Sequence, residues 1–127
     1  MELLKGQVAI ITGAASPRGL GKATAQMFAE HGARVVILDL DEAAAQDAAS
    51  DLGEGHFGWA CDVTAKTECD AAVTAVLEAF GQVDILVNNA GITQPLKIME
   101  ISHENYDAVL DVNLLGTLNM SQAVIPY

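Results

Sequence analysis

Small and polar residues that could bind a ligand follow several short apolar segments of this 127-residue sequence. The first set is the glycine-bearing turn from Gly13 to Gly21, which joins the apolar segment Val8–Thr12 to a segment with helical periodicity. Glycines let the backbone of such a turn approach phosphate oxygens, and unpaired N–H groups at the start of a helix attract negative charge. The turn therefore predicts a cradle for a diphosphate.

The same turn has two competing interpretations. Gly21 and Lys22 are reminiscent of a nucleoside-triphosphate loop, GxxxxGK[ST], whose lysine binds the outer phosphates and whose hydroxyl residue holds magnesium. However, Ser16 stands where that pattern needs its first glycine, and Ala23 stands where it needs serine or threonine. A third interpretation is a glycine-rich turn that only joins a strand to a helix.

An acidic residue, Asp39, ends the second apolar segment, 18 residues after Gly21. A carboxylate at this place can accept hydrogen bonds from the ribose hydroxyls of NAD, and it repels the additional phosphate of NADP. Alternatively Asp39 caps the helix that follows, although Asp41 is at least as well placed for capping. Arg18 favours the opposite preference, because a basic residue in the turn can accommodate NADP.

Two more strand ends carry polar residues. Asp62 ends the third apolar segment, where it could meet the edge of a base or simply cap or turn the chain. Asn88–Gly91 ends the fourth segment, and adjacent amides before a small residue and a glycine suit a backbone held close to a ligand. An ordinary polar turn explains this second set equally well.

Asn113 is at odds with its surroundings. It lies within Val109–Leu115, which is otherwise rich in helix-forming residues, and asparagine competes with the backbone and bends or interrupts a helix. Such local conflicts are often found at functional sites. The sequence therefore marks Asn113 as a candidate functional residue.

Strand and helix patterns alternate along the chain and must position these residues. Nearly continuous apolar runs predict parallel strands that are covered by helices on both faces of one sheet, an α/β fold. The apolar spacing of Leu20, Ala23, Met27 and His31 predicts a first helix, which Gly32 ends. The remaining predicted elements are strands 34–38, 56–61 and 83–88 and helices 41–52, 69–80 and one from residue 101, with Ser102 as its N-cap.

The right-handed winding of such a fold places the first strand in the centre, the second and third on one side, and the fourth on the other. The fourth strand, Val83–Asn88, would then be a sheet edge, and it has no charge, proline or bulge that would protect it. We therefore expect residues 1–127 to be the dinucleotide-binding, N-terminal half of a longer doubly wound domain that lacks its C-terminal strands here.

Composition excludes several classes of partner. Six Lys and Arg residues against 17 Asp and Glu residues give a net charge of −11, which argues against binding to nucleic acid or to anionic membrane surfaces. We see no signal peptide and no membrane-spanning segment, and we expect a cytoplasmic protein. Cys61 and Cys69 are too few for a zinc site or a disulfide framework, so we expect no metal.

The order and spacing of these motifs resemble the short-chain dehydrogenase/reductase family, in particular single-domain members similar to 3-oxoacyl-[acyl-carrier-protein] reductases and secondary-alcohol dehydrogenases. The resemblance covers the whole chain. It is carried by Thr12–Gly13 with Gly19–Gly21, by Asp39, by Cys61–Thr64, by Asn88–Gly91 and by Asp111–Asn113.

The resemblance implies a cofactor-binding role for most of these residues. Gly13, Gly19, Leu20 and Gly21 would line the pyrophosphate, Asp39 the ribose, Asp62 and Val63 the adenine, and Asn89, Ala90 and Gly91 the adenosine and nicotinamide. The family usually has three residues between its first two glycines, whereas Gly13 and Gly19 enclose five. We expect the additional residues, including Ser16 and Arg18, to bulge outward beside the adenosine.

The resemblance also implies hydride transfer between NAD and a secondary alcohol or ketone, and a homotetramer. Asn113 matches a family asparagine that interrupts a helix and holds a water molecule in a proton relay. The family's catalytic serine, tyrosine and lysine have no counterpart here, since neither Tyr106 nor Tyr127 matches the Tyr-x-x-x-Lys motif. The alternative is a non-catalytic dinucleotide-binding module, if the protein ends at Tyr127.

Overall fold

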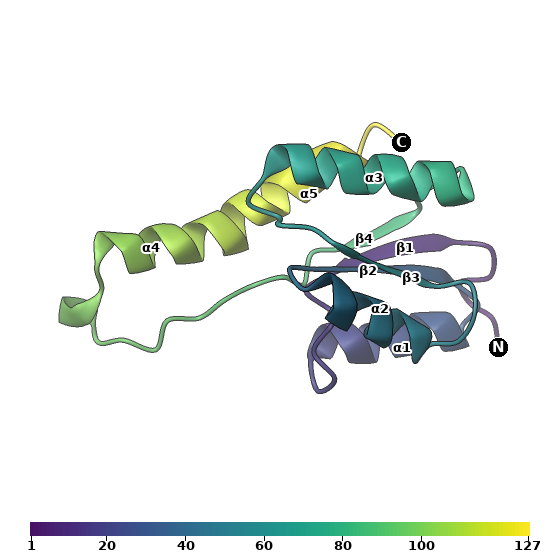
Figure 1. The fold of residues 1–127 in the computed structure, drawn as a ribbon, viewed down its shortest axis with the longest axis horizontal. Coiled ribbons are helices and arrows are strands. Elements are labelled where there is room, and N and C mark those ends of the chain that lie inside the picture. Colours follow the sequence, from purple (N-terminus) through teal and green to yellow (C-terminus); the bar gives the residue numbers. More distant parts are fainter.

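The computed structural model describes residues 1–127 as one parallel sheet with helices on both of its faces (Figure 1). The strand order is β3-β2-β1-β4, as the winding rule predicts. β1 is central because it pairs with β2 on one side and with β4 on the other; for example, Ile10 lies opposite Val36 and Leu86. The strands are β1 Val8–Thr12, β2 Arg34–Asp39, β3 Phe57–Ala60 and β4 Ile85–Val87.

Helices form two layers. α1 and α2 cover one face of the sheet, and α3 and α5 cover the other (Figure 1). A π-helix, η2, joins α4 to α5, and a short 3-10 helix, η1, precedes α4. The bounds are α1 Leu20–Glu30, α2 Glu42–Ser50, α3 Lys66–Phe80, η1 Ile98–Glu100, α4 His103–Leu110, η2 Asp111–Leu115 and α5 Gly116–Val124.

Two apolar cores hold these layers to the sheet. One lies under α3 and α5 and includes Ile10, Val73 and Met120; the other lies under α1 and α2 and includes Ile37 and Ala45. Alternate residues of the strands supply both cores, since successive side chains of a strand point to opposite faces. β1 is buried along its whole length, which explains its uninterrupted apolar sequence.

Helix ends follow the sequence signals. Asp41 accepts a hydrogen bond from the N–H of Ala44 and so caps α2, and Ser102 caps α4 in the same way through the N–H of Asn105. Gly81 ends α3 in the left-handed conformation with φ of +75°. The predicted interruption near Asn113 is present as the π-helix η2, a form that inserts an additional residue into the turn.

The apolar residues whose spacing predicts α1 lie on the exposed face of this helix, not on its buried face. Leu20 and Met27 are 83% and 54% exposed, whereas Gly21 and Ala25 are buried against the sheet. Small residues form this interface because they let the helix backbone approach the strands closely. None of the helices combines the length and the apolar character that crossing a bilayer would require.

Candidate functional site

A cavity of about 310 Å³ lies along the carboxyl ends of the four strands. In a doubly wound sheet, this is where ligands bind, at the point where the strand order changes direction between β1 and β4. The lining residues come from all four strand ends and from η2: Gly13, Leu38, Asp39, Leu40, Cys61, Asp62, Val63, Asn89, Ala90, Gly91, Ile92 and Val112.

The turn after β1 passes very close to the turn after β4. Gly13 has φ of +64°, and a Cβ atom on it would lie 2.7 Å from the Cα of Ala90. A Cβ atom on Gly21 would lie 2.5 Å from the side-chain nitrogen of Asn89. Gly13 is therefore required by close backbone approach and by its left-handed conformation, and Gly21 by the approach of the Asn89 side chain.

Thr12 and Asn89 lock these two turns together. The Thr12 hydroxyl accepts hydrogen bonds from the N–H groups of Asn89, at 3.1 Å, and Ala90, at 3.0 Å. The Asn89 amide donates to the carbonyls of Thr12 and Gly13 at 3.1 and 2.9 Å. The polar turn Asn88–Gly91 thus holds the backbone of the cavity wall in place, while Asn88 itself bonds to Ser121.

The predicted diphosphate cradle leaves its helix N-terminus open. Gly19 is the N-cap of α1, no side chain caps the helix, and its first turn has no acidic residue. Ser16, Pro17 and Arg18 are exposed, and Figure 1 shows their loop directed away from the sheet. None of these three residues lines the cavity, so the additional residues do not fill it.

The ammonium group of Lys22 is hydrogen-bonded within the protein. Its Nζ donates to the carbonyl of Ala48 and to Asp51, each at 3.0 Å, so that it joins α1 to the C-terminal end of α2. A triphosphate loop needs this lysine at the outer phosphates. The geometry therefore argues against that interpretation of the turn.

Asp39 faces the cavity with its carboxylate held in place. Oδ2 accepts from the N–H of Ala15 at 3.0 Å, and Oδ1 accepts from the N–H of Leu40 at 2.8 Å. Because Asp41 caps α2, Asp39 has no capping role. Its fixed negative charge is therefore available to a ligand in the cavity.

The turn after β3 presents an unused donor. Asp62 Oδ1 accepts from both the N–H and the hydroxyl of Thr64, at 2.9 and 2.7 Å, so Asp62 makes the turn that was one of its two interpretations. Val63 is only 7% exposed and lines the cavity. Its backbone N–H has no acceptor among the hydrogen bonds of the chain. The N–H of a buried residue normally has a hydrogen-bond partner.

Two buried thiols lie behind this turn. Burial, and secondarily the neighbouring Cys69, raises the pKa of the Cys61 thiol to about 12. Burial also raises the pKa of Cys69. Cys61 therefore presents a neutral, weakly polar surface to the cavity. No group of three or more His, Cys, Asp or Glu side chains in the chain is arranged to hold a metal ion.

Asn113 lies beside Gly91, since a Cβ atom on Gly91 would be 3.2 Å from its Oδ1, but it does not line the first cavity. Its Oδ1 accepts from the N–H of Ile92 at 2.8 Å, and its Nδ2 donates to the carbonyl of Ile92 at 2.9 Å. It lines a second cavity of about 360 Å³, formed by residues 92–94 and by α4. Ile92 lines both cavities, so Asn113 is bonded to a residue that the two cavities share.

The structure brings together only part of the predicted site. Seven predicted residues line the first cavity: Gly13, Asp39, Asp62, Val63, Asn89, Ala90 and Gly91. Ser16, Arg18, Gly19, Leu20 and Gly21 lie outside that lining, on the loop and first turn of α1. Sequence reasoning missed the apolar wall residues Leu38, Leu40, Cys61, Ile92 and Val112, and it assigned no function to Thr12. A hydroxyl residue at the end of an otherwise apolar buried strand is the signal that points to Thr12.

Known proteins share this architecture. The model of the family described as short chain dehydrogenase matches residues 7–127. An uncharacterized short-chain type dehydrogenase/reductase from Sinorhizobium fredii is 51% identical over 128 residues, which cover 98% of this chain and 51% of that protein. Galactitol 2-dehydrogenase from Agrobacterium fabrum is 46% identical over 121 residues, which cover 95% of this chain and 46% of that protein.

A solved structure agrees closely. The crystal structure of a 3-ketoacyl-(acyl-carrier-protein) reductase from Brucella melitensis, complexed with NADH, matches with a TM-score of 0.91 at 44% identity. The match covers 97% of this chain and 50% of that one. The chain thus spans about half the length of the curated relatives that it matches. It belongs to the short-chain dehydrogenase family, a family of oxidoreductases that bind a nicotinamide dinucleotide.

Proposed function

We propose that residues 1–127 form the NAD-binding half of an oxidoreductase whose substrate is a secondary alcohol or the corresponding ketone. When bound, the nicotinamide cofactor accepts or donates the hydride. The residues of this chain bind and orient that cofactor. The proposal depends above all on the cavity at the strand ends, because this is where a doubly wound sheet binds a dinucleotide.

Two of the groups that we assign to the cofactor have no partner in the chain: the N–H of Val63 and the start of α1. The free N–H of Val63 suits an acceptor nitrogen of a base, with Asp62 beside it. The uncapped start of α1, with Gly13, Gly19, Leu20 and Gly21 around it, suits a pyrophosphate. Asn89, Ala90 and Gly91 would then line the adenosine and nicotinamide side, with Ser16 and Arg18 outside the pyrophosphate.

We further propose that Asp39 makes the protein prefer NAD to NADP. Hydrogen bonds from Ala15 and Leu40 fix its carboxylate at the cavity, where it can accept from ribose hydroxyls. The 2′-phosphate of NADP would meet this charge at short range in a partly buried site, where like charges repel strongly. Arg18 is the one basic residue in the turn, and its exposed position leaves the carboxylate dominant.

We propose that Asn113 contributes to catalysis indirectly, by holding the backbone of Ile92 in place. Proton transfer by a serine, a tyrosine and a lysine is placed outside residues 1–127, because no Tyr-x-x-x-Lys motif occurs among them. Assembly as a homotetramer stays a prediction from the resemblance, and a cytoplasmic location stays a prediction from the sequence.

Titration of the purified protein with NADH and NADPH, with its intact mass recorded, tests the proposal. We expect NADH to bind at least about tenfold more tightly than NADPH, a difference of about 1.4 kcal/mol. Asp39→Asn should reduce that ratio, whereas Asp41→Asn, which removes a carboxylate two residues away, should leave it unchanged. Tighter binding of NADPH, or a ratio insensitive to Asp39→Asn, would contradict the assignment.

Activity separates the enzyme from the alternative. Oxidation of secondary alcohols with reduction of NAD would support the oxidoreductase. Binding of NADH without any turnover, in a protein whose mass equals the 13.3 kDa of this chain, would instead support a non-catalytic dinucleotide-binding module.

A further inference from the structure

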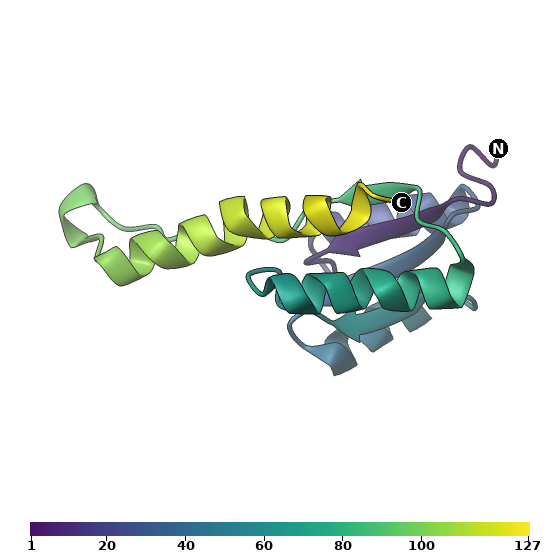
Figure 2. The same cartoon turned by 90° about the horizontal axis from the view of Figure 1, so that it is seen from above.

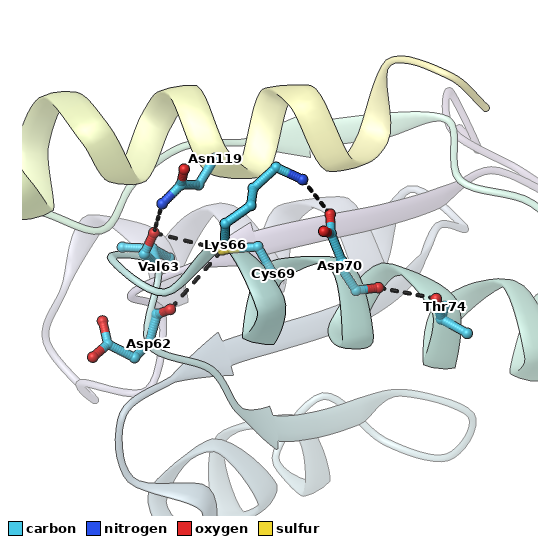
Figure 3. A network of polar contacts seen from close by, with 7 residues as sticks. All are labelled: Asp62, Val63, Lys66, Cys69, Asp70, Thr74 and Asn119. Atoms are coloured by element: carbon cyan, nitrogen blue, oxygen red, sulfur yellow. Dashed lines mark hydrogen bonds and ion pairs between the residues drawn. The ribbon is translucent and has the colours of Figure 1, made fainter.

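The backbone of Val63 is held from behind by the opposite helix layer. Its carbonyl accepts a hydrogen bond from Nδ2 of Asn119 at 2.9 Å and a second from Sγ of Cys69 at 3.5 Å. Figure 3 shows both donors converging on this one carbonyl, Asn119 from α5 and Cys69 from α3. The single proton of the Cys69 thiol is shared with the carbonyl of Asp62, at 3.9 Å, so Asn119 is the stronger donor to the Val63 carbonyl.

Asn119 is an unusual residue for its position. It is 5% exposed, and the only other buried polar residue of the chain is Thr12, which locks the glycine turn. A buried amide costs free energy unless it is hydrogen-bonded. Its placement in the core under α5 therefore indicates that the bond to Val63 is a specific requirement of the turn after β3.

A second contact joins the same helix to the same residue. Gly116, one turn before Asn119 on α5, packs so closely that a Cβ atom on it would lie 2.6 Å from Cγ2 of Val63. The side chain of Val63 is therefore seated against the helix backbone, while its carbonyl is bonded to Asn119. Together the two contacts hold the carbonyl and the side chain of Val63, and so fix the position of its Cα next to the N–H.

The helix also holds the opposite part of the cavity wall. η2 runs directly into α5, and Asn113 in η2 is bonded to both backbone groups of Ile92. Val63 and Ile92 both line the first cavity. A single continuous helix therefore fixes the turn after β3 relative to the turn after β4.

We propose that Asn119 is a positioning residue for the adenosine part of the dinucleotide: by bonding the carbonyl of Val63 it holds this residue in place, so that the free N–H on the other side of the Val63 Cα faces the base. This inference depends on the proposed function, because it assigns the turn after β3 to the adenosine. Asn119 does not line the cavity, but it sets the affinity for the adenosine end of the cofactor and not for the nicotinamide end.

Ligands that contain one end of the cofactor test this. We would measure dissociation constants for ADP-ribose, which has the adenosine but no nicotinamide, and for reduced nicotinamide mononucleotide, which lacks the adenosine. Asn119→Leu keeps a similar volume and removes the donor; Gln122→Leu makes the same kind of change at an exposed position of α5. We expect Asn119→Leu to weaken ADP-ribose about tenfold, with the mononucleotide within about twofold, and Gln122→Leu to change neither.

Equal weakening of both ligands, or no weakening of ADP-ribose by a folded Asn119→Leu, would overturn the inference and leave the proposed function standing. Failure of the unaltered protein to bind ADP-ribose at all would overturn both. Gly116→Ala is the second variant, in case Asn119→Leu does not fold, since it displaces Val63 with the Asn119 amide intact. It should produce the same selective loss of ADP-ribose, and an equal loss of both ligands would again count against the inference.

Discussion

The sheet body, residues 8–87, and the arm, residues 91–115, are held in place by different forces. Nearly all of the buried residues belong to the body, and the remainder belong to α5, which covers it. No residue of the arm is buried, and Figures 1 and 2 show α4 and the loop before it extending beyond the sheet. The arm keeps its shape through local hydrogen bonds, such as those of Ser102 with Asn105 and of Asn113 with Ile92.

This difference has a physical consequence. The body is stabilised by close packing, so its stability depends steeply on side-chain volume. The arm is stabilised by polar contacts of modest net value, so changes of apolar volume there should have little effect. The first cavity is lined mainly by the body, with Gly91, Ile92 and Val112 from the arm, and the second cavity, beside Asn113, lies in the arm.

We expect the largest loss of stability at Gly58 in β3, in the closely packed body. A Cβ atom on Gly58 would lie 2.0 Å from the carbonyl oxygen of Ala45, so Gly58→Ala must push α2 off the sheet. Because the conflict is with backbone, we expect a loss of about 4 kcal/mol in the free energy of unfolding, measured by urea denaturation. Gly53→Ala is the control: it has nothing within 4 Å and a φ of +106°, and it should cost only about 1 to 2 kcal/mol.

A matched pair of isoleucines compares the two regions directly. Ile10 in β1 is fully buried, whereas Ile98 in η1 is 80% exposed. Ile10→Ala should reduce the free energy of unfolding by about 3 kcal/mol, through lost apolar burial and the cavity left behind. Ile98→Ala should change it by less than about 0.5 kcal/mol. Similar losses at both positions would show that the arm is packed against something in solution.

Most of the body could be predicted from the sequence, because packing leaves a strong periodic signal. The uninterrupted apolar run of β1, the glycine that ends α3 and the alanine face of α2 each have one plain interpretation, and each is present. The strand order followed from the handedness of the crossovers. The helix interruption at Asn113 was predictable as a conflict between an asparagine and its helical surroundings.

Features that depend on close approach between distant segments were not predictable. The apolar spacing of Leu20 and Met27 marked the exposed side of α1, because the buried side is made of Gly21 and Ala25, which carry little apolar signal. Lys22 looked available for phosphate, and only the fold shows it bonded to the end of α2. The hydrogen bond from Asn119 to Val63 joins residues 56 positions apart, a pairing that no local pattern encodes.

A smaller loss of stability should show that polar contacts stabilise the arm. Ser102 accepts from the N–H of Asn105 and donates to its side-chain oxygen, forming a reciprocal cap at the start of α4. Ser102→Ala should destabilise α4 by about 1 kcal/mol, which we would detect as faster amide hydrogen exchange in residues 103–107. Ser102→Thr keeps the hydroxyl and should restore slow exchange. Faster exchange in the sheet as well would mean that the arm and the body unfold together.

The smallest effect concerns a polar contact inside the body. His56 accepts a hydrogen bond from the N–H of Val35 through Nδ1, at 3.0 Å, and burial, together with the nearby charge of Arg34, lowers its pKa from the ordinary value of 6.5.

Because the unfolded chain binds this proton more readily than the folded one, the neutral imidazole contributes its full stability above pH 6.5. That contribution is lost as the pH falls below 6.5, towards the lowered pKa. His56→Asn keeps an acceptor near the position of Nδ1 and removes the titration. Urea denaturation of the protein and of this variant between pH 7.5 and about 5 should therefore give a stability difference that shifts in favour of the variant as the pH falls. A difference that stays constant with pH would show that the packing around β2 and β3 holds the histidine without regard to its charge, so that even the polar contacts of the body are governed by packing.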